Sequence, residues 1–276
     1  MQFITLNDEV AIPQLGFGVW QIPDAQAYTS VAAALEVGYR HIDTAAAYEN
    51  ESGVGRAVRD SGLAREDVFL TTKLWNRDHG YDAALRAFDT SLERLGTDYV
   101  DLYLIHWPVP EQDLYVESWR ALEKIAADGR ARSIGVSNFT AETLGRLLKE
   151  GTKAPAINQI ELHPYFPQPA MREFDRKYGI ATEAWSPLGQ GGELLGEPLL
   201  AVIGDHYGKT PAQVVIRWHL QLGNVVIPKS ATPSRIRENF EVFDFELTQN
   251  EVDEITGLGR DNGRIGPNPA VFNYTG

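Results

Sequence analysis

Short apolar runs alternate with longer amphipathic stretches along the whole chain. The apolar runs are rich in β-branched residues and cover only a few positions, whereas the longer stretches repeat apolar residues with a helical period. Eight such strand-then-helix units follow one another, a pattern typical of a parallel sheet with a helix after each strand. We therefore predict that residues 1–276 form a single α/β domain, a (β/α)8 TIM barrel with an N-terminal β-hairpin over residues 3–12 and a short C-terminal loop.

The same pattern gives the bounds of each predicted element. Strands are predicted at residues 15–18, 39–43, 68–73, 100–106, 133–137, 156–161, 180–185 and 225–227. Helices are predicted at residues 25–37, 54–61, 83–95, 116–127, 142–148, 169–178, 198–206, 212–222, 233–240 and 249–256. Two helices begin at Thr-Pro pairs, Thr210-Pro211 and Thr232-Pro233, which combine an N-cap side chain with a proline in the first turn.

Polar or aromatic side chains occupy the carboxyl ends of seven consecutive predicted strands. In strand order they are Asp43, Lys73, His106-Trp107, Ser137-Asn138, Gln159, Trp185-Ser186 and Lys229-Ser230. Barrel enzymes build their active sites at this end of the strands. A single polar strand end carries little information, but seven of them at one rim predict a functional site.

Asp43 and Lys73 end neighbouring strands, so we expect them to form an ion pair at the rim. Such pairs in isolation are more often structural than catalytic. Tyr48, in the loop that follows Asp43, favours catalysis, because an ammonium beside a phenol lowers the pKa of the phenol and makes it a usable proton donor. His106 adds a group that can orient a carbonyl. The other histidines considered are expected to be structural (His41, His219) or at the surface (His79, His206).

The charge of the chain narrows its possible partners. The net charge is −13, which argues against nucleic acid and anionic membranes, because both bind basic surfaces. Against this acidic background, Lys229, Ser230 and Arg235 gather at a predicted helix start, where backbone N–H groups favour an anion. We interpret this segment as a phosphate site; the alternative is an ordinary helix start with solvated side chains.

The chain has no cysteine, no secretory leader and no apolar run long enough to span a bilayer, so we expect a cytoplasmic protein.

Several common sites are missing from the sequence. Gly16-Phe17-Gly18 begins a dinucleotide-binding fingerprint, but Gln21 occupies the third glycine position. Glu161 and His163 could join Asp43 as metal ligands, yet Lys73 would place a cation where the metal would bind. We therefore expect no metal site.

Three ordered motifs resemble those of the aldo-keto reductases. They are residues 38–45 with Tyr48 and residues 51–55, residues 102–108, and residues 227–230 with Arg235; the runs 135–138 and 158–159 add to the match. The resemblance covers nearly the whole chain and is strongest to short bacterial enzymes of the diketogluconate-reductase type. It implies NADPH as the cofactor and the reduction of aldehydes or ketones, including sugar-derived ketones or keto acids, to alcohols.

The resemblance also implies a role for each matching residue. Tyr48 would be the proton donor, Lys73 would lower its pKa, Asp43 would position Lys73, and His106 would orient the substrate carbonyl. The implied cofactor contacts run from the nicotinamide carboxamide (Ser137, Asn138, Gln159) and ring (Trp185) through the pyrophosphate (Ser186, Leu188, Gln190) to the 2′-phosphate (Lys229, Ser230, Arg235) and the adenosine (Thr232, Glu238, Asn239). The implied substrate pocket is formed by Trp20, Trp75, His106 and Trp107, with Phe272 as a further candidate.

The sequence departs from the family pattern at two places, and these departures limit which family properties can be assigned to this chain. Many relatives have tyrosine at the position of Trp185, although either ring can stack on a nicotinamide. The tail after Leu258 is short compared with the mammalian enzymes, so substrate specificity cannot be transferred.

Two other functions remain compatible with part of the sequence. One is a non-catalytic NADPH-binding regulatory module of the same fold, such as the channel-associated β-subunits; the other is a metal-dependent barrel hydrolase. The complete set of Asp43, Tyr48, Lys73 and His106 favours the reductase. We expect a small-molecule carbonyl compound as the substrate and a monomeric enzyme.

Overall fold

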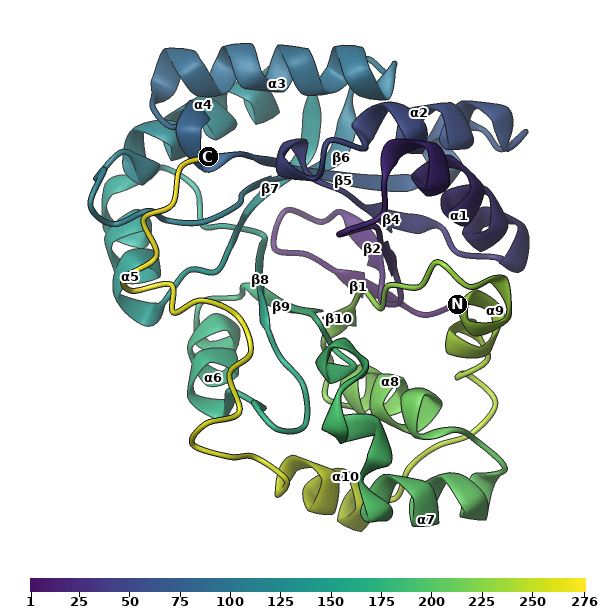
Figure 1. Cartoon of the computed structure of the whole chain (residues 1–276). Coiled ribbons are helices and arrows are strands. Elements are labelled where there is room, and N and C mark those ends of the chain that lie inside the picture. The colour runs from purple at the N-terminus through teal and green to yellow at the C-terminus, as the bar shows by residue number, and fades with distance from the viewer.

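A ring of parallel strands surrounded by helices forms the body of the protein. The computed structural model describes residues 1–276, and Figure 1 shows the ring with helices around its outside. The main sheet has eight strands in the order β10-β9-β8-β7-β6-β5-β4-β3, and all neighbouring pairs are parallel. Its strands are β3 (Phe17–Gly18), β4 (His41–Asp43), β5 (Phe69–Leu74), β6 (Val100–Ile105), β7 (Ala131–Ser137), β8 (Ile157–Glu161), β9 (Ala181–Trp185) and β10 (Val225–Val226).

Backbone hydrogen bonds between the first and last strands close the ring. The Gly16 N–H donates to the Val226 carbonyl at 2.9 Å, and the Val226 N–H donates to the Gln14 carbonyl at 2.9 Å. A parallel bridge joins Leu15 to Val226 at the same place. The predicted (β/α)8 barrel is therefore confirmed.

The helices follow the strands as the apolar pattern predicts. They are α1 (Asp24–Val37), α2 (Glu51–Asp60), α3 (Tyr81–Leu95), α4 (Tyr115–Ala127), α5 (Ala141–Glu150), α6 (Pro169–Lys177), α7 (Pro198–Tyr207), α8 (Pro211–Gln221), α9 (Pro233–Phe240) and α10 (Gln249–Thr256). Short 3-10 helices are η1 (Ala46–Tyr48), η2 (Arg65–Asp67), η3 (Asn76–Asp78), η4 (Gly189–Gly191) and η5 (Glu193–Gly196). Predicted and observed bounds differ by no more than three residues, because the apolar period locates an element better than it locates its ends.

The two predicted Thr-Pro helix starts differ in their capping. Thr210 forms a reciprocal capping box with Gln213 at the start of α8, as predicted. Thr232 precedes the first-turn proline of α9, but its side chain makes no cap hydrogen bond. Instead, the Thr232 N–H donates to Ser230 Oγ at 3.1 Å. The prediction of a threonine side-chain cap is wrong for α9, because the neighbouring serine organises this turn.

The predicted N-terminal hairpin closes the barrel at the amino ends of the strands. Strands β1 (Phe3–Thr5) and β2 (Ala11–Pro13) pair antiparallel, and Figure 1 shows them across the opening of the ring. Leu6 and Ile12 of this hairpin form one buried cluster with inward-facing barrel residues, including Phe69, Leu102 and Val225. This apolar floor leaves only the carboxyl ends of the strands available for a site.

The barrel interior changes from apolar to polar above this floor. On β5, the inward positions run from Phe69 to Thr71 and Lys73, because alternate residues of a strand share a face. On β8, Ile157 at the floor is followed by Gln159 one layer higher. Buried polar groups need partners, so this upper layer indicates a functional rather than a purely structural interior.

Candidate active site

A large cavity opens at the carboxyl ends of the barrel strands. Its volume is about 1160 Å³, more than the ~300–1,000 Å³ typical of a site for one drug-sized ligand. Of the predicted site residues, Lys73 and the further candidate Phe272 are missing from its wall. The wall includes Trp20, Asp43, Tyr48, Trp75, His106, Trp107, Ser137, Asn138, Gln159, Trp185, Ser186, Leu188, Gln190, Lys229, Ser230, Thr232, Arg235, Glu238 and Asn239.

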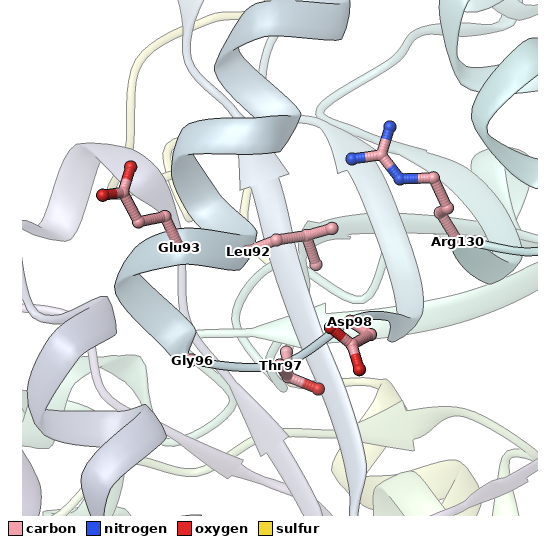
Figure 2. Close-up of a pocket in the computed structure, with 6 residues that line it drawn as sticks. All are labelled: Leu92, Glu93, Gly96, Thr97, Asp98 and Arg130. Carbon is pink, nitrogen blue, oxygen red and sulfur yellow. The ribbon is translucent and has the colours of Figure 1, made fainter.

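A smaller cavity of about 420 Å³ lies beside the carboxyl end of α3 (Figure 2). Its wall includes Glu93, Asp98 and Arg130, and Arg130 pairs with Asp89. Figure 2 shows the Glu93 carboxylate pointing away from Arg130, so the polar groups do not converge on one point. We assign no chemistry to this cavity.

The predicted ion pair between Lys73 and Asp43 lies at the base of the large cavity. Lys73 Nζ donates to Asp43 Oδ1 at 2.6 Å and to the Thr44 carbonyl at 2.9 Å. The two side chains of the pair are only 0% and 2% exposed. Burial alone would lower the pKa of Lys73, but Asp43, Tyr48 and Glu183 together raise it above the ordinary value. Lys73 is therefore a permanently charged ammonium held in a fixed position.

Tyr48 lies beside this ammonium at the carboxyl end of η1. Lys73 Nζ is 5.1 Å from the centre of the Tyr48 ring. Burial raises the pKa of Tyr48, and the positive charge of Lys73 lowers it, as the sequence predicted; the net direction is nevertheless upward. The phenol is therefore protonated at neutral pH, and the ammonium is placed to stabilise the phenolate that remains after proton transfer.

His106 lies beside Tyr48. Together with the Lys73–Asp43 pair, these two side chains form one corner at the end of the cavity. The ring centre of His106 lies 5.6 Å from that of Tyr48 and 5.2 Å from that of Trp75, both in edge-to-face arrangements. Burial, reinforced by the charge of Lys73, holds the pKa of His106 well below its ordinary value. A neutral imidazole can donate or accept a hydrogen bond, so His106 is suited to orienting a carbonyl group.

Gln159 joins the strand ends across the middle of the barrel. Its Nε2 donates to Asp43 Oδ2 at 2.8 Å and to Glu183 Oε2 at 2.9 Å. Glu183 was not predicted from the sequence. The strand alternation could have indicated it, because Glu183 lies two positions before Trp185 and therefore shares its inward face.

Trp185, at the end of β9, is held by the amide of Asn138, which follows β7 two strands away. Its Nε1 donates to Asn138 Oδ1 at 2.8 Å, while Asn138 Nδ2 donates to the His106 carbonyl and to Ser137 Oγ, both at 3.0 Å. Asn138 adopts a left-handed backbone conformation with φ of 62°, which is uncommon outside glycine. These contacts fix the indole plane at the cavity wall, and they leave Asn138 and Ser137 limited capacity to bind a ligand.

Basic residues occupy the other end of the cavity. Lys229, in the loop before α9, and Arg235, in the first turn of α9, are both exposed and line the cavity. Glu238, on the same helix, accepts a hydrogen bond from Thr210 Oγ1 at 2.8 Å. The helix N-terminus and the two cations together favour an anion at this end.

The C-terminal tail crosses the rim beside the cavity (Figure 1). Glu161 anchors it, because its carboxylate accepts hydrogen bonds from the N–H groups of Ile265 and Gly266. Phe272 packs on Trp107 with ring centres 4.4 Å apart, but it does not line the cavity as the sequence suggested. Tyr274, which was not predicted, contributes to the wall.

The histidine predictions hold with one exception. His41 and His219 are fully buried and His206 is exposed, as expected. His79 is buried, with 6% of its surface exposed, so its predicted surface position is wrong. His79 directly follows η3 in the loop between β5 and α3, and this explains the error, because loop sequences carry no periodic burial signal.

No group of three or more His, Cys, Asp or Glu side chains gathers where it could hold a metal ion. Glu161 and His163, considered as ligands from the sequence, bind each other at 3.1 Å. Glu161 also binds the tail, and Asp43 is paired with Lys73. These carboxylates therefore have other structural partners.

Comparison with known proteins agrees with this geometry. The model of the aldo/keto reductase family matches residues 14–260. This chain belongs to the aldo/keto reductase family. An aldo-keto reductase of Mycolicibacterium smegmatis is 59% identical over 99% of this chain and 98% of its own length. The family prediction and the predicted reduction of aldehydes or ketones are thus confirmed.

Two further relatives place this reductase within the family. The methylglyoxal reductase DkgA of Escherichia coli K12 is 50% identical over 98% of this chain and 97% of its own length. The crystal structure of a Gox0644 mutant in complex with NADPH has a TM-score of 0.95 and 45% identity, and each chain is covered to 99%. The predicted likeness to short bacterial reductases of the diketogluconate type agrees with the first of these.

Proposed function

We propose that this aldo/keto reductase takes its hydride from NADPH and that Tyr48 donates the proton that completes the alcohol. One juxtaposition carries the proposal: Tyr48, the buried Lys73–Asp43 pair and neutral His106 meet at one end of a cavity whose other end is basic. A similar solved structure contains NADPH. The non-catalytic module and the metal-dependent hydrolase, in contrast, do not require this corner.

The donor groups of the cavity fit NADPH along its length. Lys229, Arg235 and the start of α9 suit the 2′-phosphate, with Ser230, Thr232, Glu238 and Asn239 nearby at the adenosine end. Ser186, Leu188 and Gln190 line the middle of the cavity, where the pyrophosphate would lie. Trp185 offers a fixed plane, and the Gln159 side-chain oxygen is available to the carboxamide. Ser137 and Asn138 lie beside it, with the limited remaining hydrogen-bonding capacity described above. Bound NADPH would supply a hydride to the carbonyl carbon.

The proton chemistry follows from the side chains at the corner. His106 is neutral and holds the carbonyl oxygen of the substrate near the Tyr48 hydroxyl. Tyr48 donates its proton to that oxygen as the carbonyl carbon is reduced. Lys73 stabilises the resulting phenolate, and Asp43 keeps Lys73 charged and in place.

Small aldehydes and ketones are the proposed substrates. Trp20, Trp75 and Trp107 form aromatic walls around the corner, and a few polar groups among apolar walls are typical of small-molecule sites. Methylglyoxal reductases of Yersinia pestis and Escherichia coli are 53% and 50% identical to this chain. Methylglyoxal is therefore the first substrate to test, followed by keto acids and sugar-derived ketones.

We further propose that the chain acts as a single-domain monomer in the cytoplasm. A cluster of 54 buried residues joins the barrel to its helices, which supports one domain. The net charge of −13 supports the expectation that neither nucleic acid nor an anionic membrane is a partner. None of the helices is long and apolar enough to cross a membrane.

Cofactor titration followed by a substrate panel tests the proposed function. NADPH and NADH are added while tryptophan fluorescence is followed, and NADPH consumption is then recorded with each carbonyl compound. NADPH binding with turnover supports the reductase. NADPH binding without turnover favours the regulatory module, and activity that disappears on chelation favours the hydrolase.

A further inference from the structure

A second carboxylate, Glu183, lies inside the barrel beneath the proposed nicotinamide site. Its side chain is fully buried on β9. Oε2 accepts the hydrogen bond from Gln159 Nε2 at 2.9 Å. Oε1 has no hydrogen-bond partner and lies 3.8 Å from His41 Nε2. A buried carboxylate with one oxygen unpaired is costly, and the proton chemistry proposed above does not use it.

Glu183 and Asp43 together fix the orientation of the Gln159 amide. The two N–H groups of Nε2 each reach one carboxylate, at 2.8 Å for Asp43 and 2.9 Å for Glu183. An amide has only two N–H donors, so both are used. The side-chain oxygen Oε1 of Gln159 accepts no hydrogen bond within the protein, and Gln159 lines the cavity. Its oxygen is thus available as an acceptor for the N–H groups of a carboxamide.

No cationic side chain pairs directly with Glu183. Lys73 is the one buried ammonium, and it binds Asp43 directly. Burial and the negative charge of Asp43 raise the pKa of Glu183 to about 8, although Gln159 and Lys73 oppose this change. Burial lowers the pKa of His41 to about 3, so His41 is neutral. At neutral pH the barrel interior therefore contains one ammonium, one carboxylate and one protonated Glu183.

We propose that Glu183 is a positioning residue that, in its neutral form, locks Gln159 toward the nicotinamide carboxamide and leaves Lys73 balanced by Asp43 alone. This inference rests on the proposed use of NADPH. The titratable groups that face Glu183 are Asp43 and His41 from β4, Lys73 from β5 and Tyr48 from η1. Of the two strands paired with β9, β10 offers only Val225 and Val226, and β8 places Gln159 opposite Glu183.

Ionisation of Glu183 would make Tyr48 a weaker proton donor. A second buried negative charge raises the pKa of Lys73 and of Tyr48 further, because each already responds to Glu183 in that direction. A less acidic phenol is a poorer proton donor. Turnover in the direction of reduction should therefore fall as pH rises through about 8, the pKa of Glu183.

The test compares Glu183→Gln, Glu183→Leu and a control, Asp175→Asn, with the wild type. Asp175 is also fully buried, and burial raises its pKa to about 7, but its partners are Thr182 and Asn158, not Gln159. Three quantities are measured: the NADPH dissociation constant at pH 7 by tryptophan fluorescence, the melting temperature of the cofactor-free protein from pH 5 to 9, and the pH profile of kcat.

Glu183→Gln imitates the protonated side chain, so its NADPH affinity at pH 7 should equal that of the wild type. Its kcat should no longer fall near pH 8. Glu183→Leu leaves one Gln159 N–H unpaired and should weaken NADPH binding about tenfold. Asp175→Asn should change neither the NADPH affinity nor the kcat profile.

The melting temperatures provide a measurement that does not depend on activity. The pKa of Glu183 in the folded protein, about 8, lies above the ordinary value of 4.5. Its stabilising contribution is therefore fully present below pH 4.5 and is lost as pH rises through about 8. Glu183→Gln lacks this loss, so its melting temperature should rise relative to the wild type between pH 5 and 9.

The outcomes separate this inference from the proposed function. Coincident pH profiles of the wild type and Glu183→Gln, in kcat and in melting temperature, would overturn it, as would wild-type NADPH affinity in Glu183→Leu. If Glu183→Leu does not fold, the Glu183→Gln profiles decide. A wild-type protein that binds NADPH but reduces no carbonyl compound contradicts the proposed function, whereas the affinities and melting temperatures still decide the role of Glu183.

Discussion

The two ends of the cavity are built in different ways. At the catalytic end, Asp43, Lys73 and His106 come from strand ends and are at least nine-tenths buried. At the basic end, Lys229 and Arg235 are exposed and come from a loop and the first turn of a helix. Buried side chains on strands keep one geometry, whereas exposed long side chains must be ordered when a ligand binds. We infer that the protein fixes the chemistry in advance and orders the phosphate contacts only on binding.

Removal of the Tyr48 hydroxyl should have the largest effect of the substitutions, and this effect should be on turnover, at the catalytic end of the cavity. Tyr48→Phe deletes the proposed proton donor and leaves the ring in place, so turnover should fall by about 10²–10⁴-fold. NADPH affinity should change little, because the basic end is unaffected. Steady-state kinetics and fluorescence titration measure the two effects separately. Tyr28→Phe, which removes an exposed hydrogen bond to Asp60 on the outer helices, is the control; full activity in Tyr48→Phe would contradict the assigned role.

Breaking the buried ion pair should affect both stability and turnover. Lys73→Met leaves the Asp43 carboxylate buried without a cation, which typically costs about 3–5 kcal/mol in the free energy of unfolding. Urea unfolding and turnover with a small aldehyde check both effects. Lys124→Met breaks an exposed pair with Asp128 and should cost less than about 1 kcal/mol. Equal stabilities of the two variants would show that the Lys73–Asp43 pair contributes no more than a surface pair.

At the basic end, a substitution should weaken binding without altering chemistry. Arg235→Ala should raise the NADPH dissociation constant by about 10–100-fold and leave the NADH constant unchanged, because only NADPH carries the 2′-phosphate. At saturating NADPH, kcat should remain at the wild-type value. Arg237→Ala is the matched control, since Arg237 is exposed on the same helix but does not line the cavity. Equal losses of affinity for both cofactors would place the phosphate elsewhere.

The smallest predicted effect concerns the tail. Glu161→Gln weakens the anchor of Ile265 and Gly266, so amide hydrogen exchange over residues 260–276 should accelerate while the barrel strands remain protected. Burial alone would raise the pKa of Glu161, but hydrogen bonds from His163, Ile265 and Gly266 together lower it. The anchor should therefore hold at neutral pH and weaken only as pH falls below 4.5. Unchanged exchange in Glu161→Gln would show that other contacts hold the tail.

The sequence predicted the fold and the polar strand ends of the cavity wall for the same reason, whereas the other predicted wall residues followed from the family resemblance. Strand alternation and helical period give the elements, and the barrel then brings distant strand ends such as Asp43 and Gln159 to one rim. The Asp43–Lys73 contact followed from adjacent strands alone. Local pattern and topology were sufficient for these predictions.

Features that depend on three-dimensional packing were not predictable in this way. The net pKa direction of Tyr48 depends on its burial, which the sequence does not show. Glu161 meets Ile265 across 104 positions of chain without any periodic signal. In the sequence, nothing distinguishes Glu183 from other charged residues in strands; only its hydrogen bond to Gln159 in the folded structure does.

One measurement tests the central claim most directly: nicotinamide absorbance recorded after wild-type protein is mixed with NADPH and methylglyoxal, with the alcohol product quantified. The account predicts that NADPH is consumed and that one molecule of alcohol forms for each NADPH oxidised. If NADPH binds but its absorbance stays constant with methylglyoxal and with every other aldehyde and ketone tried, the corner formed by Tyr48, Lys73 and His106 is not a carbonyl-reducing site.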